Sequence, residues 1–285
     1  MADPGYTERQ FRSQDSLRLY WRDYGDPASP RTPVLCLPGL TRNSKDFHKV
    51  ALALAAERRV VCPDYRGRGR SDHDPDWRHY QPGTYLDDIR HLLIVAGIHR
   101  VAVIGTSMGG LLATGLATMM PSAIAGVLLN DVGPDLAPDG LERIFAYVGR
   151  DWPQPDWATA VEHLKTLLPL LGLDNEEDWM TFARNTFREG VDGRLHVDWD
   201  IRLALPFRKP AAPPPDLWAL LRGLAGVPVA AIRGENSDVL KPETFEHMAD
   251  ALPDLYRVTV PGRGHAPTLE EAPSVEAIGW LLDRV

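Results

Sequence analysis

Short apolar runs along the chain alternate with segments in which apolar residues recur at helical spacing. The apolar runs predict strands at 17–24, 33–37, 59–62, 101–104, 124–131, 227–234 and 255–260. Helical periodicity predicts helices at 84–98, from Ser107 to about Pro121, from about Pro242 to Ala251 and at 271–284. Strands that alternate with helices favour a mostly parallel sheet with helices on both faces.

This alternation stops between about residues 134 and 222. The segments EHLKTLLPLLGL and EDWMTFARNTF in this stretch have helical patterns, and the proline-rich FRKPAAPPPD near its end is typical of a stiff, extended chain. The simplest interpretation is a helical insertion that splits one α/β domain. We therefore expect a core formed by residues 1–133 and 223–285, and a helical cap (lid) formed by 134–222.

Composition and charge narrow the classes of partner. The net charge is −8, from 31 basic and 39 acidic residues, and RGRGR is the only basic cluster, so neither nucleic acid nor a membrane surface is an expected partner. The first residues, MADPGYTERQFRSQDS, lack the apolar centre of a signal peptide, and no run is long enough to cross a bilayer. Cys36 and Cys62 each lie in a predicted strand and are expected as buried, reduced thiols. These features predict a cytoplasmic protein.

A candidate nucleophile lies in the stretch GTSMGG, where a predicted strand gives way directly to a predicted helix. Gly105, Thr106 and Ser107 are all that remain for the turn, so the chain must reverse tightly around Ser107. A serine between glycines in a strand–turn–helix setting is the context of a nucleophile elbow. The hydroxyl would then project at the carboxyl edge of the sheet, where open α/β folds bind ligands.

A serine hydroxyl needs a base that accepts its proton. Of the histidines that follow Ser107, His163 and His196 fall in the insertion and His247 falls in a predicted helix. His265 lies in the glycine-rich loop VPGRGHAP after the last predicted strand, from which it can reach the sheet edge. We therefore predict His265 as the general base.

The histidine in turn needs an acid that fixes its tautomer. Asp238, in the loop RGENSD after strand 227–234, lies at the same edge of the sheet. Asp131, which ends the preceding predicted strand, could also reach His265 and remains the alternative. The glycine-containing turn and the position in the chain favour Asp238.

Two backbone amides are candidates for an oxyanion hole. Met108 follows the serine at a helix N-terminus, where the partial positive charge favours a developing negative charge. The second donor is expected from the loop LPGLTRN after strand 33–37, in which Gly39 permits close approach of the backbone. Its expected donor is the amide of Leu40.

Five short motifs in this order resemble the α/β-hydrolase family, specifically its cap-bearing branch. They are PGL at 38–40, DYRGRGRSD at 64–72, GTSMGG at 105–110, RGENSD at 233–238 and GRGH at 262–265. The resemblance implies an eight-stranded sheet, a helical cap, a Ser107–His265–Asp238 triad, and neither a cofactor nor a metal ion. Most members have a histidine where this chain has Pro38, and the loop before Asp238 is one residue longer than the common spacing.

These groups predict a serine hydrolase that cleaves a small to medium carboxylic ester or lactone through an acyl-enzyme. Cleavage of a carbon–carbon bond in a diketone-type acid and thioester hydrolysis remain alternatives, and the complete triad argues against a member that only binds a ligand. The expected substrate is a partly apolar small molecule, with Arg42 as a possible partner for a carboxylate and Trp152 as a possible apolar contact. The sequence is compatible with a monomer or a dimer.

Overall fold

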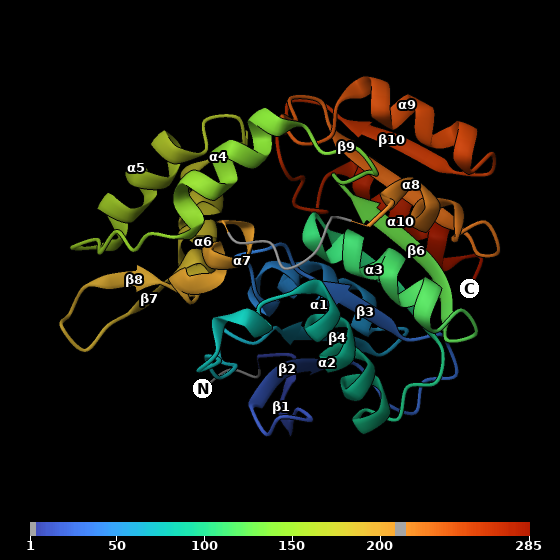
Figure 1. Cartoon of the computed structure of the whole chain (residues 1–285), viewed down its shortest axis with the longest axis horizontal. Coiled ribbons are helices and arrows are strands. Elements are labelled where there is room, and N and C mark those ends of the chain that lie inside the picture. The colour runs from blue at the N-terminus through green and yellow to red at the C-terminus, as the bar shows by residue number, and fades with distance from the viewer. Residues whose placement is uncertain (1–3, 209–214) are drawn as a thin grey trace.

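The computed structural model describes residues 4–208 and 215–285, so that residues 209–214 of the proline-rich segment lie outside the described residues. An eight-stranded sheet forms the core, in the order β1-β2-β4-β3-β5-β6-β9-β10 (Figure 1). Strand β2 pairs antiparallel with β1 and β4, and the neighbouring pairs from β4 to β10 are parallel. The predicted fold class, a mostly parallel eight-stranded sheet of the α/β-hydrolase type, is therefore confirmed. The strands are β1 (Thr7–Arg12), β2 (Arg18–Tyr24), β3 (Val34–Leu37), β4 (Val60–Asp64), β5 (Val101–Thr106), β6 (Ile124–Asn130), β9 (Val229–Gly234) and β10 (Tyr256–Val260).

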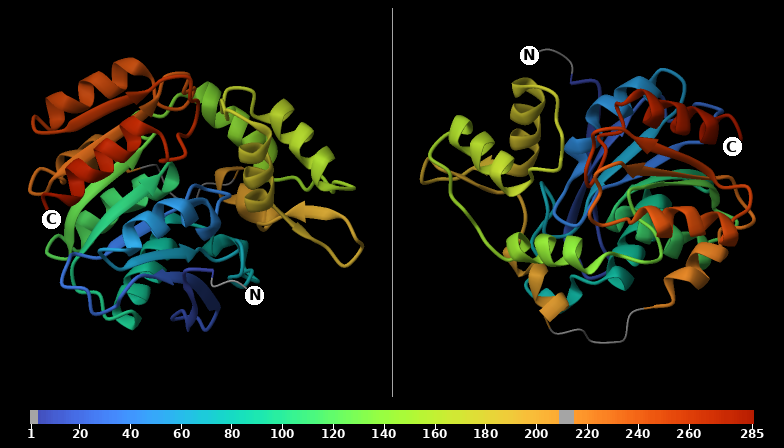
Figure 2. Two further views of the ribbon diagram at one scale, coloured as in Figure 1. Left: turned by 180° about the vertical axis from the view of Figure 1, so that it is seen from behind. Right: turned by 90° about the horizontal axis from the view of Figure 1, so that it is seen from above.

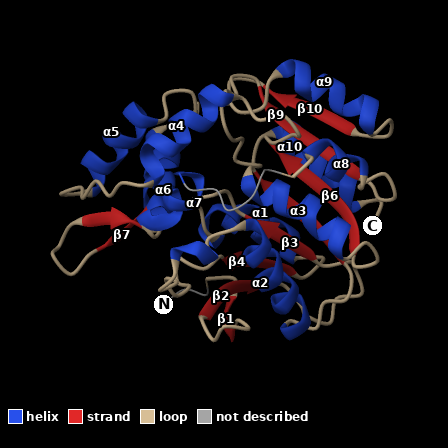
Figure 3. Ribbon diagram, in the orientation of Figure 1, coloured by secondary structure: helices blue, strands red, loops and turns tan. Residues whose placement is uncertain are grey.

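Helices cover both faces of this sheet (Figures 2 and 3). One face packs against α1 (His48–Ala55) and α10 (Ala272–Leu282). The other packs against α2 (Pro82–Val95), α3 (Met108–Met119) and α9 (Pro242–Ala251). Short 3-10 helices lie at η1 (Ser44–Phe47), η2 (Trp77–His79) and η3 (Ile201–Ala204).

Successive residues of the central strands pack on opposite faces of the sheet, as the geometry of a strand requires. In β3, Leu35 and Leu37 belong to the α2/α3 side of the core, whereas Val34 and Cys36 belong to the α1/α10 side. All four side chains are fully buried, which explains why β3 shows a continuous apolar run rather than an alternating one. Cys36 and Cys62 are buried free thiols, as the sequence predicted.

The chain between β6 and β9 forms a separate group of elements beside the core (Figure 1). It contains α4 (Pro138–Val148), α5 (Trp157–Leu167), α6 (Glu176–Thr186), a hairpin of β7 (Phe187–Glu189) and β8 (Leu195–Val197), and α7 (Leu205–Arg208). Helix α8 (Leu217–Arg222) falls inside the predicted cap, yet it packs against α3 and α9 of the core. We therefore propose a cap that begins at about residue 134 and ends before α8.

Ion pairs join this cap to the core. Among the described residues, the pairs of a lysine or arginine with a carboxylate that join cap and core are Arg143–Asp238 at 2.5 Å, Lys45–Asp198 at 2.9 Å, Lys49–Asp178 at 3.7 Å and Arg263–Asp174 at 2.5 Å. In all of them except Arg143–Asp238, the cation belongs to the core and the carboxylate to the cap. Within residues 4–208 and 215–285, no helix is both long and apolar enough to span a membrane.

Candidate active site

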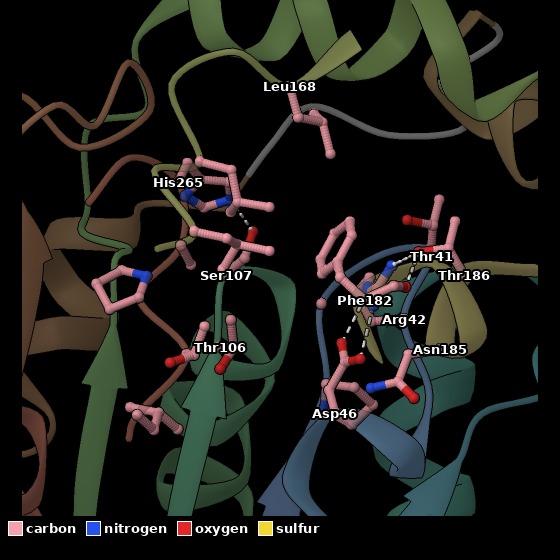
Figure 4. Close-up of a pocket in the computed structure, with 18 of the residues that line it drawn as sticks. Thr41, Arg42, Asp46, Thr106, Ser107, Leu168, Phe182, Asn185, Thr186 and His265 are labelled. Atoms are coloured by element: carbon pink, nitrogen blue, oxygen red, sulfur yellow. Dashed lines mark hydrogen bonds and ion pairs between the residues drawn. The ribbon is translucent and has the colours of Figure 1, made fainter. Parts of the chain in front are cut away.

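Ser107 occupies a strained turn between β5 and α3, with φ 53° and ψ −119°. A Cβ atom at Gly105 would overlap the backbone of Gly109, and one at Gly109 would overlap the carbonyl group of Leu37. The two glycines therefore allow α3 to start close to the sheet, which leaves the serine at the tip of the turn. Figure 4 shows Ser107 at the base of a pocket with His265 beside it.

His265 lies in the loop after β10, and its Nε2 is 2.9 Å from the Oγ of Ser107. The side chain is 9% exposed, so the imidazole contacts the pocket but is largely shielded from bulk water. Asn130, at the end of β6, donates hydrogen bonds to the Oγ1 of Thr106 and to the carbonyl of Pro267. This amide ties the serine turn to the histidine loop, a role that the sequence reasoning missed.

The partner of the histidine is Asp131. Its Oδ2 lies 2.6 Å from the Nδ1 of His265, and the residue is fully buried directly after β6 with φ 54°. The structure thus corrects the sequence-based preference for Asp238, which does not hydrogen-bond to His265. Asp238 instead forms a bidentate pair with Arg143, with N–O distances of 2.5 and 2.7 Å.

The loop after β9, which was expected to supply the acid through Asp238, instead donates hydrogen bonds to Asp131. The backbone N–H of Gly234 donates to Asp131 Oδ1 across 2.8 Å, and the Ser237 hydroxyl donates to Asp131 Oδ2 across 2.6 Å. The Oγ of Ser237 also accepts hydrogen bonds from the N–H groups of Val239 and Leu240, so its own hydrogen is directed at the carboxylate. With these donors and His265, a buried carboxylate has its hydrogen-bonding capacity largely satisfied. The sequence feature that could have indicated this support for Asp131 is Ser237, which directly precedes Asp238.

Arg143 and Asp238 perturb one another. Burial by itself would raise the pKa of the Asp238 carboxyl, but the hydrogen bonds and charge of Arg143, with a contribution from His265, hold that pKa below its ordinary value. Burial lowers the pKa of Arg143, and the hydrogen bonds and charge of Asp238 reverse this effect and raise it. Both groups are therefore charged at neutral pH.

The two predicted oxyanion donors are the N–H groups of Leu40 and Met108. Met108 is the first residue of α3, so its N–H has no acceptor within the helix. Leu40 lies in the turn after β3, and its carbonyl accepts a hydrogen bond of 2.8 Å from Arg68 Nε. Tyr65 donates to the carbonyl of Pro38 at 3.2 Å, which supports the loop at the position where most members have a histidine.

Arg42 lines the pocket, but its charge is already matched (Figure 4). It forms a bidentate pair with Asp46, with both N–O distances at 2.6 Å, and its Nη1 donates to Thr186 Oγ1. Its guanidinium also lies 4.2 Å from the ring centre of Phe182 on cap helix α6. The expectation that Arg42 is free to receive a substrate carboxylate is therefore corrected: it links the Leu40 loop to the cap.

The pocket around Ser107 has a volume of about 360 Å³ and lies between the core and the cap. Its floor includes Ser107, His265 and the Leu40 loop, and its cap side is mostly apolar. The apolar cap residues that line it are Ile144, Leu164, Leu167, Leu168, Leu171, Leu173, Phe182 and Trp199. The expectation for Trp152 is corrected, because among the described residues it does not line this pocket; its ring lies 5.3 Å from that of His163.

One group of metal-ligand side chains occurs in the described part of the chain, outside the pocket: Asp15, Asp74 and His79. The buried guanidinium of Arg66 donates to Asp15 at 2.7 Å, to Asp74 at 2.5 Å and to Asp88 at 2.7 Å. Because Arg66 donates hydrogen bonds to all of these carboxylates, we interpret the group as an ion-pair cluster that fixes the loop after β4. The absence of a cofactor and of a metal ion stays a prediction.

Comparison with known proteins identifies the class. A family model described as the alpha/beta hydrolase family matches residues 34–277. The chain therefore belongs to the alpha/beta hydrolase family, which confirms the resemblance in its sequence motifs.

Similar proteins include hydrolases along the whole length of the chain. A 3-hydroxybutyrate-oligomer hydrolase from Cupriavidus necator is 39% identical over 259 residues, covering 88% of each protein. A 2-(acetamidomethylene)succinate hydrolase from Mesorhizobium japonicum is 24% identical over 243 residues, covering 81% of each. A crystal structure of an alpha/beta hydrolase from Novosphingobium aromaticivorans has 44% sequence identity and a TM-score of 0.93, with 99% of each chain covered.

Proposed function

We propose that the protein hydrolyses a carboxylic ester through an acyl-enzyme on Ser107, with His265 as general base and Asp131 as the acid that orients it. The observation that carries this proposal is a pair of hydrogen bonds made by one imidazole. His265 Nε2 lies 2.9 Å from Ser107 Oγ, and His265 Nδ1 lies 2.6 Å from Asp131 Oδ2. This geometry fits nucleophile activation by a base that a third group orients.

Each step of the reaction has a group that can perform it. His265 accepts the proton of Ser107 as Oγ attacks the ester carbonyl, and Asp131 stabilises the imidazolium that forms. The N–H groups of Leu40 and Met108 are the proposed donors to the oxyanion. The imidazolium then protonates the leaving alcohol, and a water molecule activated by His265 releases the acid from Ser107.

The pocket and one relative support a proposal for the substrate class. A volume of about 360 Å³ with a mostly apolar cap side suits a small, partly apolar substrate. The Cupriavidus necator relative acts, by its name, on oligomers of 3-hydroxybutyrate, whose repeating units are small hydroxy-acid esters. We therefore propose short oligoesters of hydroxy acids as substrates, with lactones of similar size as the next candidates.

Carbon–carbon cleavage of a diketone-type acid is less well supported, because it would require a cation that binds the substrate carboxylate. Arg42, the candidate for that role, is paired with Asp46 and hydrogen-bonded to Thr186. Thioester hydrolysis would use the same nucleophile, base and oxyanion donors as ester hydrolysis, so it is distinguished only by measurement.

The test uses the purified protein with p-nitrophenyl butyrate and with dimers and trimers of 3-hydroxybutyrate. We expect a burst of nitrophenol that approaches one equivalent per enzyme if deacylation limits turnover, covalent labelling by a fluorophosphonate, and release of 3-hydroxybutyrate. Ser107→Ala should abolish all three. Labelling without turnover of any ester, lactone or thioester, together with cleavage of a dienoic diketone acid, would assign the alternative chemistry instead.

A further inference from the structure

We propose that Arg143, on cap helix α4, tunes the protonation of the His265 base by neutralising the carboxylate of Asp238. The inference rests on the proposed function for its catalytic meaning. Under this proposal the cap has an electrostatic role at the reaction centre in addition to enclosing the pocket. The Asp238 carboxylate, which is not part of the proposed triad, then has a role as well.

The loop that carries Asp238 lies against the loop that carries His265. The N–H of Asn236 donates to the carbonyl of Arg263 at 2.8 Å. Gly234 is so close to the backbone of Gly264 that a Cβ atom would overlap it. Asp238 is also the immediate neighbour of Ser237, whose hydroxyl binds Asp131. The Asp238 loop therefore packs against the His265 loop, and the charge of His265 contributes to the lowered pKa of the Asp238 carboxyl, although the two side chains share no hydrogen bond.

Helix α4 contacts the Asp238 loop through its backbone as well as through the Arg143–Asp238 ion pair. The N–H of Ala137 donates to the carbonyl of Val239 at 2.9 Å, and Gly140 packs directly against the carbonyl of Asp238. Arg143 lies one turn further along the same helix and reaches Asp238 with two hydrogen bonds. The position of the cap helix thus determines whether the carboxylate is compensated.

Most other charges around His265 are balanced without Arg143. Asp131 is hydrogen-bonded to the imidazole itself, and Arg263 on the histidine loop pairs with Asp174 and Glu271. Burial raises the pKa of Tyr147 on α4, which stays neutral. The remaining ionisable groups around the pocket are Arg42, Asp46, Lys49, Asp178 and Glu270, all engaged in ion pairs.

Breaking the Arg143–Asp238 pair from either side should therefore have opposite effects. In Arg143→Gln an uncompensated negative charge remains near the imidazole and favours its protonated form. In Asp238→Asn an uncompensated positive charge remains and favours the neutral form. If the ion pair only held the cap in place, both variants would change the titration of His265 in the same direction, because both lose the same ion pair.

The experiment is an NMR titration of the His265 ring, assigned by its loss in His265→Gln, together with the pH profile of kcat/KM for p-nitrophenyl butyrate. We expect the titration midpoint to rise in Arg143→Gln and to fall in Asp238→Asn, each by about half a pH unit. The double variant should return towards the parent, and Arg143→Lys, which keeps the charge, should stay close to it.

Arg257→Gln is the matched control, because Arg257 has a similar exposure (27% against 25%) and pairs with Glu246 at 2.7 Å, but does not line the pocket. It should not move the midpoint. Equal midpoints in the parent and in both single variants, or shifts in the same direction, would overturn the inference. Because the NMR titration does not require turnover, an inactive parent would reject the proposed function alone.

Discussion

The hydroxyl of Ser237 donates a hydrogen bond of 2.6 Å to the carboxylate of Asp131, although 106 positions separate the two residues in the chain. The same carboxylate oxygen lies 2.6 Å from His265 Nδ1. Ser237 therefore constrains the group that orients the imidazole, and the loop after β9 supports the acid that follows β6.

Ser107→Ala should lower kcat for p-nitrophenyl butyrate by at least about 10³-fold, because the groups of a triad act as a unit. The fold should be retained, since the hydroxyl is not part of the core; circular dichroism and the thermal midpoint check this. A variant that keeps more than about a tenth of the parent rate would contradict the assignment of Ser107 as the nucleophile.

Replacing the two candidate acids should have very different effects. Asp131→Asn should lower kcat by about 10³–10⁴-fold, because the amide favours the wrong tautomer of the imidazole. Asp238→Asn, measured on the alkaline plateau of the pH profile, should stay within about tenfold of the parent, because Asp238 makes no hydrogen bond to His265. The reverse order of effects would return the role of the acid to Asp238.

Ser237→Ala should lower kcat by about 10-fold to 100-fold with little change in KM, because outer partners of a functional group orient it without touching the substrate. The matched variant is Ser237→Thr, which keeps a hydroxyl at the same position and should recover most of the activity. Steady-state kinetics with p-nitrophenyl butyrate measure both variants. If alanine and threonine reduce kcat equally, the loss comes from disturbed packing and not from the missing hydrogen bond.

Asp15 should contribute to stability in a pH-dependent way. Burial would raise the pKa of its carboxyl, but hydrogen bonds from Arg66 and Ser13 lower it to about 2, from an ordinary value of 3.8. A carboxyl whose pKa is lower in the folded state stabilises the protein above the unfolded-state value, and this stabilisation is lost as the pH falls through the folded-state value.

We therefore expect Asp15→Asn to lower the free energy of unfolding at pH 7 by about 1 kcal/mol, a figure reduced for the partial exposure of Asp15. The difference from the parent should shrink between about pH 4 and about pH 2. Urea denaturation at several pH values measures both quantities. Asp87→Asn is the control, because Asp87 makes a long, exposed contact of 3.5 Å with Arg90 and should change stability little at any pH.

The sequence predicted the central strands and the candidate nucleophile and base, because each has a strong local signal. Ser107 lies where a strand and a helix leave only a tight turn, and His265 follows the last strand in a glycine-rich loop. β1, by contrast, has one buried side chain, Phe11, so its sequence contains no apolar run from which a strand could be predicted.

The choice between Asp131 and Asp238 depended on the direction of a side chain at the end of a strand, which strand patterns do not specify. Arg143, which binds Asp238, lies in a different part of the chain, and its contact is a tertiary one. The same applies to Trp152 and Trp199: both are aromatic cap residues, and only the packing of the cap determines that Trp199 lines the pocket.

The cap–core ion pairs make the attachment of the cap dependent on dissolved salt. Lys49–Asp178 is separated by 3.7 Å and partly exposed, and mobile ions screen such a contact at moderate ionic strength. Arg143–Asp238 and Lys45–Asp198 are better shielded and keep more of their attraction. Rising salt concentration should therefore weaken the Lys49–Asp178 contact at the N-terminal end of α6 before it weakens the Arg143–Asp238 pair on α4 or the Lys45–Asp198 pair near the C-terminal end of α6, so that the first turn of α6 is the part of the cap whose attachment depends most on ionic strength.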